Sequence, residues 1–242
     1  MPVVSVSHLS KVFRIPHEKR DTLFAALTGL VKPPTYESLY ALRDINFSVE
    51  EGEMFGIIGE NGSGKSTLLK ILAKIMRPTS GSIETSRTVT PFLELGVGFQ
   101  VDFTAVENIR VYGIIMGLSE REIEGKIDEI LEFGGLEKFR DTKLKNFSTG
   151  MYVRLAFSTA IQTRPEILLL DEVLAVGDLE FQRKCLSVLE KFKKEGVTII
   201  FVSHDLASVR NHCSRTLLLS KGEQVMMGET KEVVDRYEKG VQ

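Results

Sequence analysis

The sequence predicts an α/β fold in which a mainly parallel sheet carries antiparallel strands at its front and a helical lobe inserted between two halves of the sheet. Three observations predict it. Short, continuous apolar runs, typical of strands buried on both faces, alternate with amphipathic helical segments. A glycine-rich stretch at 59–67 separates one such strand from a helix, and mainly helical sequence fills about residues 101–160.

Length and composition exclude several other classes of protein. The chain has 242 residues, of which 43% are apolar and 26% charged, and its formal net charge is −2. These values are normal for a globular chain and argue against disorder, a collagen-like repeat or a small disulfide scaffold. The near-zero charge balance argues against a nucleic-acid partner. We expect one domain over residues 1–242.

Cysteine use and hydropathy indicate the compartment. Cys185 and Cys213 fit no metal or redox spacing, so we interpret both as core thiols in a reducing compartment. Each apolar run is shorter than the roughly 20 residues that a membrane-spanning helix needs. Residues 1–6 lack the basic and long apolar regions of a signal peptide. The prediction is a cytosolic chain, able to associate peripherally with a membrane.

The front of the chain contains three expected strands and one insertion. Strands are predicted at 3–6, 42–50 and 54–58; the second alternates and should be half-exposed, whereas the third is apolar throughout. Residues 14–40 lie between the first two predicted strands, and we interpret them as an insertion in the front lobe with a short helix at 21–29.

The remaining elements alternate between helix and strand. Ser119 and Glu122 form a capping box that should open a helix with Ile123, Ile127 and Leu131 in one apolar stripe. Further helices are expected at 66–75, 151–161 and, with Gly196 as its stop, from about Phe181; further strands are expected at 167–170, 197–202, 216–219 and 223–227.

The stretch at 59–67 matches the pattern GxxxxGK[ST] in the strand-to-helix context that the motif requires. Its glycines allow successive N–H groups to point at phosphate oxygens, and the helix N-terminus adds its positive dipole end. Lys65 would reach the β- and γ-phosphates of a nucleotide, and the Ser66 hydroxyl would bind Mg²⁺. The candidate phosphate-binding residues are Gly59, Glu60, Asn61, Gly62, Ser63, Gly64, Lys65, Ser66 and Thr67.

Two carboxylates follow the predicted strand at 167–170. Asp171 and Glu172 stand at its carboxyl end, where open α/β sheets bind ligands. Asp171 suits a role in holding Mg²⁺, and Glu172 could orient or deprotonate the attacking water. Together with the phosphate loop they predict a nucleotide hydrolase.

With these motifs, the chain resembles the ATP-binding cassette (ABC) ATPases over nearly its whole length. Phe147-Ser148-Thr149-Gly150-Met151 stands where that family has its signature sequence, commonly Leu-Ser-Gly-Gly-Gln. Thr149 and Met151 depart from that form, whereas Ser148 and Gly150 are retained. The resemblance implies that Ser148, Thr149 and Gly150 contact the γ-phosphate of ATP bound on an opposite subunit.

Three more motifs follow the family order. Gln100 resembles the glutamine that touches Mg²⁺ and senses the membrane partner, Asp178 the loop aspartate that communicates across the dimer, and His204 the switch histidine that contacts the γ-phosphate. The family also stacks adenine on an aromatic residue near the front strands. Phe13 and Tyr40 both qualify, and Tyr40 is favoured.

Several stretches resemble the branch that exports polysaccharides and polyols, including lipid-linked O-antigen, capsule and teichoic acid. They are 93–100, 107–109, 171–178, the signature and the early insertion. The branch implies a homodimer that hydrolyses ATP with Mg²⁺. The homodimer would be held at the cytoplasmic face of the cell membrane by an integral membrane permease, and the permease would export a lipid-linked glycan. Some members carry a C-terminal carbohydrate-binding domain, and we expect none here.

Three alternatives remain. A non-transport ATPase of the same fold, such as a DNA-repair or translation factor, would carry long coiled-coil or zinc-hook insertions or a second cassette. The ATPase of another transport branch is disfavoured by the insertion and by residues 95–99. A regulator that binds but does not hydrolyse nucleotide is disfavoured by the presence of Lys65, Glu172 and His204.

Overall fold

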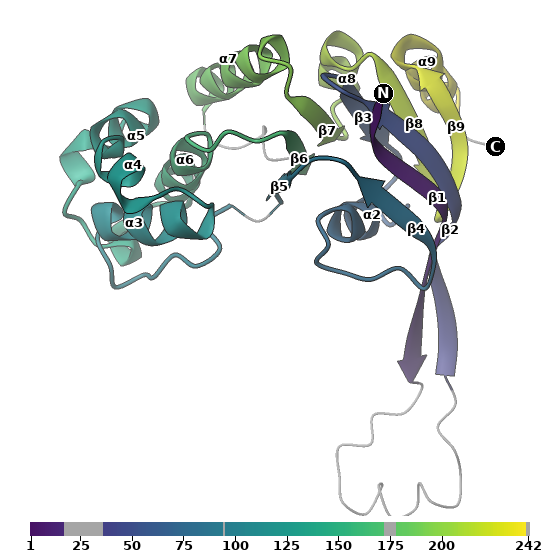
Figure 1. Cartoon of the computed structure of the whole chain (residues 1–242), viewed down its shortest axis with the longest axis horizontal. Coiled ribbons are helices and arrows are strands. Elements are labelled where there is room, and N and C mark those ends of the chain that lie inside the picture. The colour runs from purple at the N-terminus through teal and green to yellow at the C-terminus, as the bar shows by residue number, and fades with distance from the viewer. Residues whose placement is uncertain (17–35, 94, 172–177, 241–242) are drawn as a thin grey trace, which may run out of the picture.

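The computed structural model describes residues 1–16, 36–93, 95–171 and 178–240. Within these ranges one nine-stranded sheet has the order β4-β1-β2-β9-β8-β3-β7-β6-β5, and helices pack against both of its faces (Figure 1). The strands are β1 (Pro2–Pro16), β2 (Tyr36–Glu50), β3 (Met54–Ile58), β4 (Ser80–Thr85), β5 (Val89–Phe92), β6 (Ile167–Asp171), β7 (Thr198–Val202), β8 (Arg215–Ser220) and β9 (Glu223–Glu229).

The centre of the sheet is parallel, which confirms the predicted fold class. Strands β5, β6, β7, β3 and β8 pair in parallel, and every residue of β3 and β7 is buried. Continuous apolar strands are the pattern that burial on both faces requires. Strand β9 returns antiparallel to β8.

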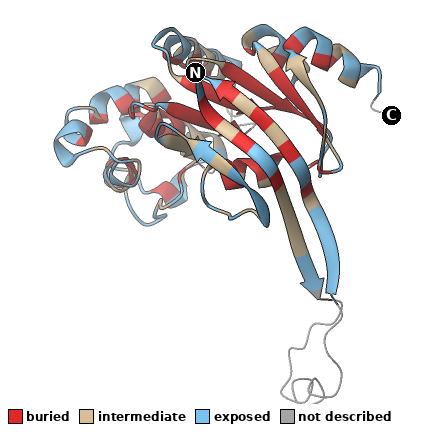
Figure 2. Cartoon of the chain, turned by 45° about the vertical axis from the view of Figure 1, so that its right-hand side comes forward, coloured by how far each residue is buried: buried red, intermediate tan, exposed pale blue. Residues whose placement is uncertain are grey.

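The front of the sheet is antiparallel, with β1 between β2 and β4. Strands β1 and β2 are each 15 residues long and stay paired as far as Pro16 and Tyr36. They project beyond the body of the molecule (Figure 1), and the far end of β2 is exposed (Figure 2). The sequence predicted shorter strands here; the helix expected at 21–29 lies outside the described residues.

The helices α3 to α6 lie between β5 and β6 and form a lobe with its own apolar core. Two capping boxes open helices there: Thr104 with Glu107, and the predicted pair Ser119 with Glu122. The sequence predicted a single helix after Ser119, but the structure has two helices, α4 and α5, because the helix is interrupted at Gly125 and Lys126. The helices are α2 (Lys65–Leu72), α3 (Ala105–Ile115), α4 (Glu120–Glu124), α5 (Ile127–Gly134), α6 (Thr149–Ala160), α7 (Leu179–Lys194), α8 (Leu206–His212) and α9 (Thr230–Glu238), with 3-10 turns η1 (Glu137–Phe139) and η2 (Leu144–Asn146).

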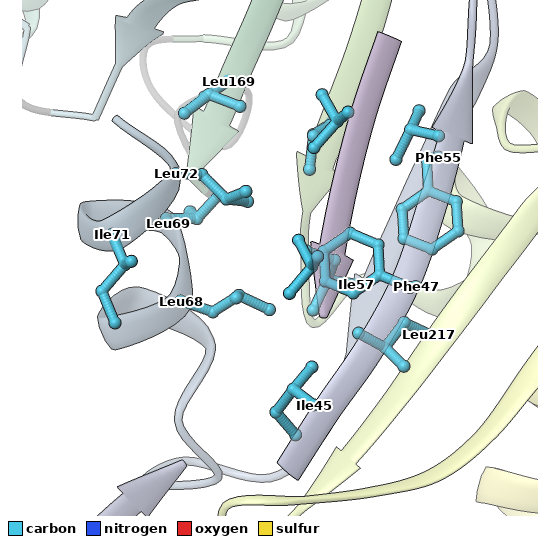
Figure 3. Packing of buried hydrophobic residues seen from close by; sticks show 14 of the residues in the cluster. Ile45, Phe47, Phe55, Ile57, Leu68, Leu69, Ile71, Leu72, Leu169 and Leu217 are labelled. Carbon is cyan, nitrogen blue, oxygen red and sulfur yellow. The ribbon is translucent and has the colours of Figure 1, made fainter. Parts of the chain in front are cut away.

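The core lies on both faces of the sheet. On one face, α2 and the front strands pack against β3, and the rings of Phe47 and Phe55 stack with centroids 5.4 Å apart (Figure 3). On the other face, helices α6 to α9 cover the strands, with Phe157 and Phe181 in edge-to-face contact. Because the central strands are packed on both faces, the positions of their carboxyl ends, where ligands bind in such sheets, are fixed.

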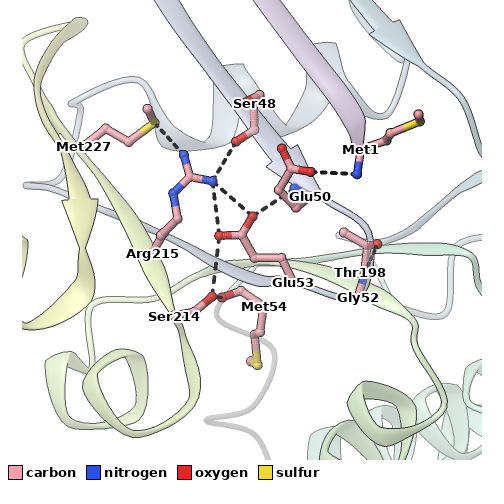
Figure 4. Close-up of polar contacts among 10 residues, drawn as sticks. All are labelled: Met1, Ser48, Glu50, Gly52, Glu53, Met54, Thr198, Ser214, Arg215 and Met227. Carbon is pink, nitrogen blue, oxygen red and sulfur yellow. Dashed lines mark hydrogen bonds and ion pairs between the residues drawn. The ribbon is translucent and has the colours of Figure 1, made fainter.

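A polar cluster joins the starts of the central strands, at the edge opposite the phosphate loop. The Arg215 guanidinium donates to a Glu53 carboxylate oxygen at 3.2 Å and to the carbonyl of Ser48 at 3.3 Å (Figure 4). Only 7% of the Glu53 side chain is exposed, so this ion pair is largely desolvated. It links the starts of β3 and β8 to the end of β2.

Both cysteines are buried in the core, as predicted, and burial raises the pKa of each thiol to about 12. Among the residues described, no helix has the length and apolar character to cross a membrane.

Candidate active site

A pocket of about 560 Å³ opens at the carboxyl edge of the sheet. It lies where the phosphate loop after β3, the end of β6 and the paired strands β1 and β2 meet. The lining residues are Phe13, Leu39, Tyr40, Ala41, Asn61, Gly62, Gly64, Lys65, Ser66, Thr67 and Asp171. The structure thus brings both predicted aromatic residues, most of the phosphate loop and the predicted acidic strand end into one cavity; Leu39 and Ala41 were not foreseen.

The glycines of the phosphate loop are required by close backbone packing. A Cβ at Gly59 would lie 2.1 Å from the Leu219 carbonyl oxygen, and one at Gly64 would lie 2.6 Å from that of Ala41. Gly64, with φ of 105°, is the N-cap of α2 and supplies no capping side chain. The first N–H groups of α2 are therefore available to anionic oxygens in the pocket.

Lys65 lies inside the loop, only 7% exposed. Its ammonium donates to the carbonyls of Gly59 at 2.7 Å and Glu60 at 2.9 Å. A buried ammonium is costly unless hydrogen-bonded, and these carbonyls hold the charge at the pocket wall. The hydroxyl of Ser63 is also buried and has no hydrogen-bond partner among the described residues.

Ser66 and Asp171 line the same pocket from different elements, α2 and the end of β6. A hydroxyl and a carboxylate are the hard oxygen ligands that suit Mg²⁺. The donor set therefore fits a magnesium ion beside a triphosphate. Glu172, the predicted base, lies outside the described residues.

The aromatic wall comes from two paired strands, with Val12 opposite Tyr40 and Phe13 opposite Leu39. The guanidinium carbon of Arg43 lies 4.5 Å from the centroid of the Tyr40 ring, and the Lys11 ammonium lies 5.1 Å from that of Phe13. Tyr40 is 48% exposed. Both candidates for stacking a base line the cavity, and each has a cation near its ring, but the register places the two side chains on opposite faces of the paired strands.

Gln100 does not line the pocket; it is exposed in the loop before α3, and its backbone is held by Asn108. The Asn108 side-chain oxygen accepts from Gln100 N–H at 2.7 Å, and its amide donates to the Gln100 carbonyl at 3.0 Å. Two further bonds from that amide reach the carbonyls of Phe103 and Thr104. Asn108 is fully buried, and sequence reasoning assigned it no role, although a polar residue inside an apolar helix face was a usable signal.

Ser148 is the N-cap of α6, and its hydroxyl accepts from Met151 N–H at 3.2 Å. Asp178 is the N-cap of α7, accepts from Phe181 N–H at 2.9 Å and pairs with Arg154 of α6. The Phe181 N–H, and then Arg154, lower the pKa of Asp178. His204 is exposed between β7 and α8. None of Ser148, Asp178 and His204 lines the pocket of the single chain.

The parallel sheet, the phosphate loop after a buried strand and the acidic strand end beside it define a P-loop nucleotide-binding protein. The sequence profile of the ABC transporter family matches residues 42–175. The chain belongs to this family, binds ATP and hydrolyses it in a reaction coupled to transport.

Curated relatives align along nearly the whole chain. The ABC transporter protein AbcA of Aeromonas salmonicida is 44% identical, covering 98% of this chain and 76% of its own length. An O-antigen export system ATP-binding protein RfbB of Klebsiella pneumoniae is 36% identical over 99% of both chains. A teichoic acids export ATP-binding protein TagH of Listeria innocua is 37% identical, covering 98% of this chain and 70% of its own.

Solved structures share the fold. An ATP-binding subunit of an ABC transporter superposes with a TM-score of 0.76 at 23% identity, over 99% of this chain and 95% of its own. The ATP-binding cassette MJ0796, in a dimeric post-hydrolysis state bound to ADP and Pi, gives a TM-score of 0.74 at 24% identity, over 94% and 98%.

Proposed function

We propose that this chain is the ATP-hydrolysing subunit of a system that exports a lipid-linked polysaccharide or polyol across the cytoplasmic membrane. The observation that carries the proposal is similarity over 98–99% of this chain, at 36–37% identity, to relatives named for O-antigen and teichoic acid export. The pocket that joins Lys65, Ser66 and Asp171 supports the ATPase part. In this proposal residues 1–242 form one cassette, with 14–40 as an insertion and about 101–160 as the signature lobe.

The triphosphate lies on the loop from Gly59 to Thr67, with Lys65 against its β- and γ-phosphates. Adenine stacks on Tyr40 or Phe13. Ser66 and Asp171, which line the pocket, would hold Mg²⁺ together with Gln100 of the loop before α3, and the ion would neutralise phosphate charge.

Glu172 takes a proton from the attacking water as the water oxygen bonds to the γ-phosphorus and the bond to the β–γ bridging oxygen breaks. His204 contacts the γ-phosphate.

Two copies face each other head to tail. Ser148, Thr149 and Gly150 at the start of α6 meet the γ-phosphate bound on the other copy, since a helix N-terminus favours anionic oxygens. ATP then contacts both copies and favours the closed dimer, and hydrolysis removes that preference. Asp178, at the start of α7, takes part in communication between the copies.

An apolar groove beside the Gln100 loop is the proposed permease contact. It has a volume of about 420 Å³ and runs between β5 and α3. Val97 and Ile115 in its lining are each more than half exposed, as is Ile75 beside them. Exposed apolar side chains gathered in one groove are typical of a binding surface. The permease would hold this chain at the cytoplasmic face of the membrane and move the glycan.

The test is steady-state ATPase activity of the purified chain with Mg²⁺, compared with Glu172→Gln. Removing a general base costs on the order of 100-fold or more in rate, while the amide keeps the size of the side chain and should leave ATP binding intact. Lys65→Ala is the variant for comparison with Glu172→Gln, because Lys65→Ala should lose ATP binding as well as ATPase activity. Unchanged activity in Glu172→Gln would exclude Glu172 as the base, and absence of ATP binding by the wild type would overturn the site.

A further inference from the structure

We propose that the turn between β8 and β9, Lys221-Gly222, is a positioning device that sets the spacing between the phosphate loop and β2, the strand that carries Tyr40, the favoured base-stacking residue. The turn thereby determines how tightly the nucleoside part of ATP binds. The proposal rests on the nucleotide site proposed above and assigns a role to residues that do not line the pocket.

The sheet order creates the need for such a device. The phosphate loop follows β3, whereas Tyr40 lies on β2, and β9 and β8 lie between these two strands. Their direct chain connection, Glu51-Gly52, is at the opposite end of both strands. At the nucleotide end, β2 meets the phosphate loop through the close packing of Gly64 against the Ala41 carbonyl, and the turn adds a hydrogen-bonded link between the two.

The turn makes this link with two backbone hydrogen bonds in opposite directions. The Gly222 N–H donates to the Ser63 carbonyl of the phosphate loop at 3.1 Å. The Gly222 carbonyl accepts from the Arg43 N–H of β2 at 2.7 Å. Among the described residues, the ladder between β2 and β9 has one register pair, Arg43 with Glu223, directly beside this bridge.

Residue 222 must be glycine for this contact. Its φ is 82°, in the left-handed region that favours glycine. A Cβ there would lie 2.8 Å from the Ala41 carbonyl oxygen and 3.2 Å from that of Tyr40. Both are backbone atoms of β2, so a side chain would push that strand away from the turn.

Displacement of β2 would act on the base rather than on the phosphates. The Arg43 N–H is held by the turn, and the Arg43 guanidinium covers one face of the Tyr40 ring. A nucleotide bound at both ends needs the ring and the phosphate loop at matched spacing. A triphosphate without a base has no such requirement.

The experiment measures binding of ATP and of inorganic tripolyphosphate, by calorimetry, to the wild type and to Gly222→Ala. We expect ATP affinity to fall about tenfold, the loss of roughly one base–aromatic stack, and tripolyphosphate affinity to stay within about twofold. Gly196→Ala is the matched control. Gly196 has a φ of 84°, and a Cβ there would meet nothing within 4 Å. Its variant carries the same backbone strain without the clash and should bind both ligands as the wild type does.

Unchanged ATP affinity in Gly222→Ala, or an equal loss for both ligands, would overturn the proposal. Failure of the wild type to bind either ligand would instead overturn the nucleotide site itself. If Gly222→Ala does not fold, hydrogen exchange on the wild type decides. ATP, which is bound at both ends, should slow exchange of the two bridging N–H groups, those of Gly222 and Arg43, whereas tripolyphosphate should slow exchange in residues 59–67 alone. Exchange at Gly222 and Arg43 that ATP leaves unchanged, or that tripolyphosphate slows equally, would overturn the proposal.

Discussion

The ammonium of Lys65 is held by carbonyl groups of its own loop before any nucleotide arrives. Two neutral acceptors, at 2.7 and 2.9 Å, satisfy a charge that is almost fully buried. Phosphate oxygens would add charged acceptors, which bind an ammonium more strongly than carbonyls do. The lysine is thus pre-positioned at the pocket wall, and little side-chain entropy is left to lose on binding.

Asn108 is the residue on which the Gln100 loop depends. Its side chain makes four hydrogen bonds to backbone groups of residues 100–104 and is fully buried. Asn108→Ala removes the acceptor of the Gln100 N–H and one of two hydrogen bonds to each of the three carbonyls, and we expect a loss of about 2 kcal/mol in the free energy of unfolding. We also expect kcat for ATP to fall more than ATP affinity, because Gln100 would lose its position while Lys65 would not.

Urea unfolding and steady-state kinetics provide the measurements for Asn108→Ala. The control is Ala in place of Asn211, an exposed residue of α8, which should change neither quantity. A variant with wild-type stability and wild-type kcat would show that Asn108 does not hold the loop.

Residue by residue, the sequence predicted what local pattern determines. Lys65, Ser66 and Asp171 belong to a contiguous motif and a strand end, and they line one pocket as expected. Gly222 bonds to backbone groups of Ser63 and Arg43, which lie far from it in the sequence, and Asn108 bonds to the backbone of residues 100–104 through a buried side chain. No spacing rule identifies such contacts, because they depend on which strands lie side by side.

The middle of helix α6 is joined to the N-terminal end of α7. Asp178 caps α7 and pairs with Arg154 of α6, whose guanidinium also lies 5.4 Å from the Phe181 ring centroid. The ion pair and the ring contact therefore join the middle of α6 to the start of α7.

This tie predicts a pH dependence. Asp178 has its pKa lowered below the ordinary 3.8, first by the Phe181 N–H and then by Arg154. A carboxyl group whose pKa is lower in the folded than in the unfolded state stabilises the fold at pH values above its unfolded-state pKa. This stabilisation is lost as the pH falls through the folded-state pKa. Asp178→Asn keeps the cap, since asparagine is a good N-cap, but removes the charge. Its deficit in thermal stability against the wild type should be constant above about pH 5 and vanish in stronger acid.

Thermal melts across pH measure this effect. Asp141→Asn is the control; Asp141 is exposed and forms no ion pair with the residues that the structure describes. Added salt should also reduce the deficit, because exposed pairs are screened. A deficit that is the same at the lowest pH at which both proteins still fold as at pH 7 would mean that the charge of Asp178 stabilises nothing.

The sequence predicted the element boundaries that depend on local signals and missed those that depend on tertiary contacts. The capping box at Ser119 opens a helix as predicted, and α7 ends two residues before Gly196. The stripe of Ile123, Ile127 and Leu131 suggested one helix, but Gly125 ends α4 and α5 starts again at Ile127. The length of β1 and β2 was missed because pairing with each other, rather than burial, extends them to Pro16 and Tyr36.

The molecule as a whole presents its pocket and its signature helix as separate features. The pocket is lined by the β1–β2 pair, the phosphate loop and Asp171, and by no residue of α6. Ser148, the N-cap of α6, does not contribute to the pocket of its own chain, which fits the proposed contact with nucleotide bound to a second copy. In the dimer proposed above, ATP bound to one copy would meet α6 of the other, so that nucleotide binding would favour dimerisation.

We accordingly expect Glu172→Gln, which should bind ATP without hydrolysing it, to shift from monomer to dimer when ATP is added and to return when ATP is removed. Adding Ser148→Arg should abolish the shift, because a long side chain at the start of α6 would occupy the place of the γ-phosphate. ATP affinity of the monomer should stay near that of Glu172→Gln alone, since Ser148 does not line the pocket. Sedimentation velocity with and without ATP measures both. A dimer that forms equally well with Ser148→Arg would show that α6 does not meet the nucleotide of a second copy, and a monomer under all conditions would place the dimer's stability in the permease instead.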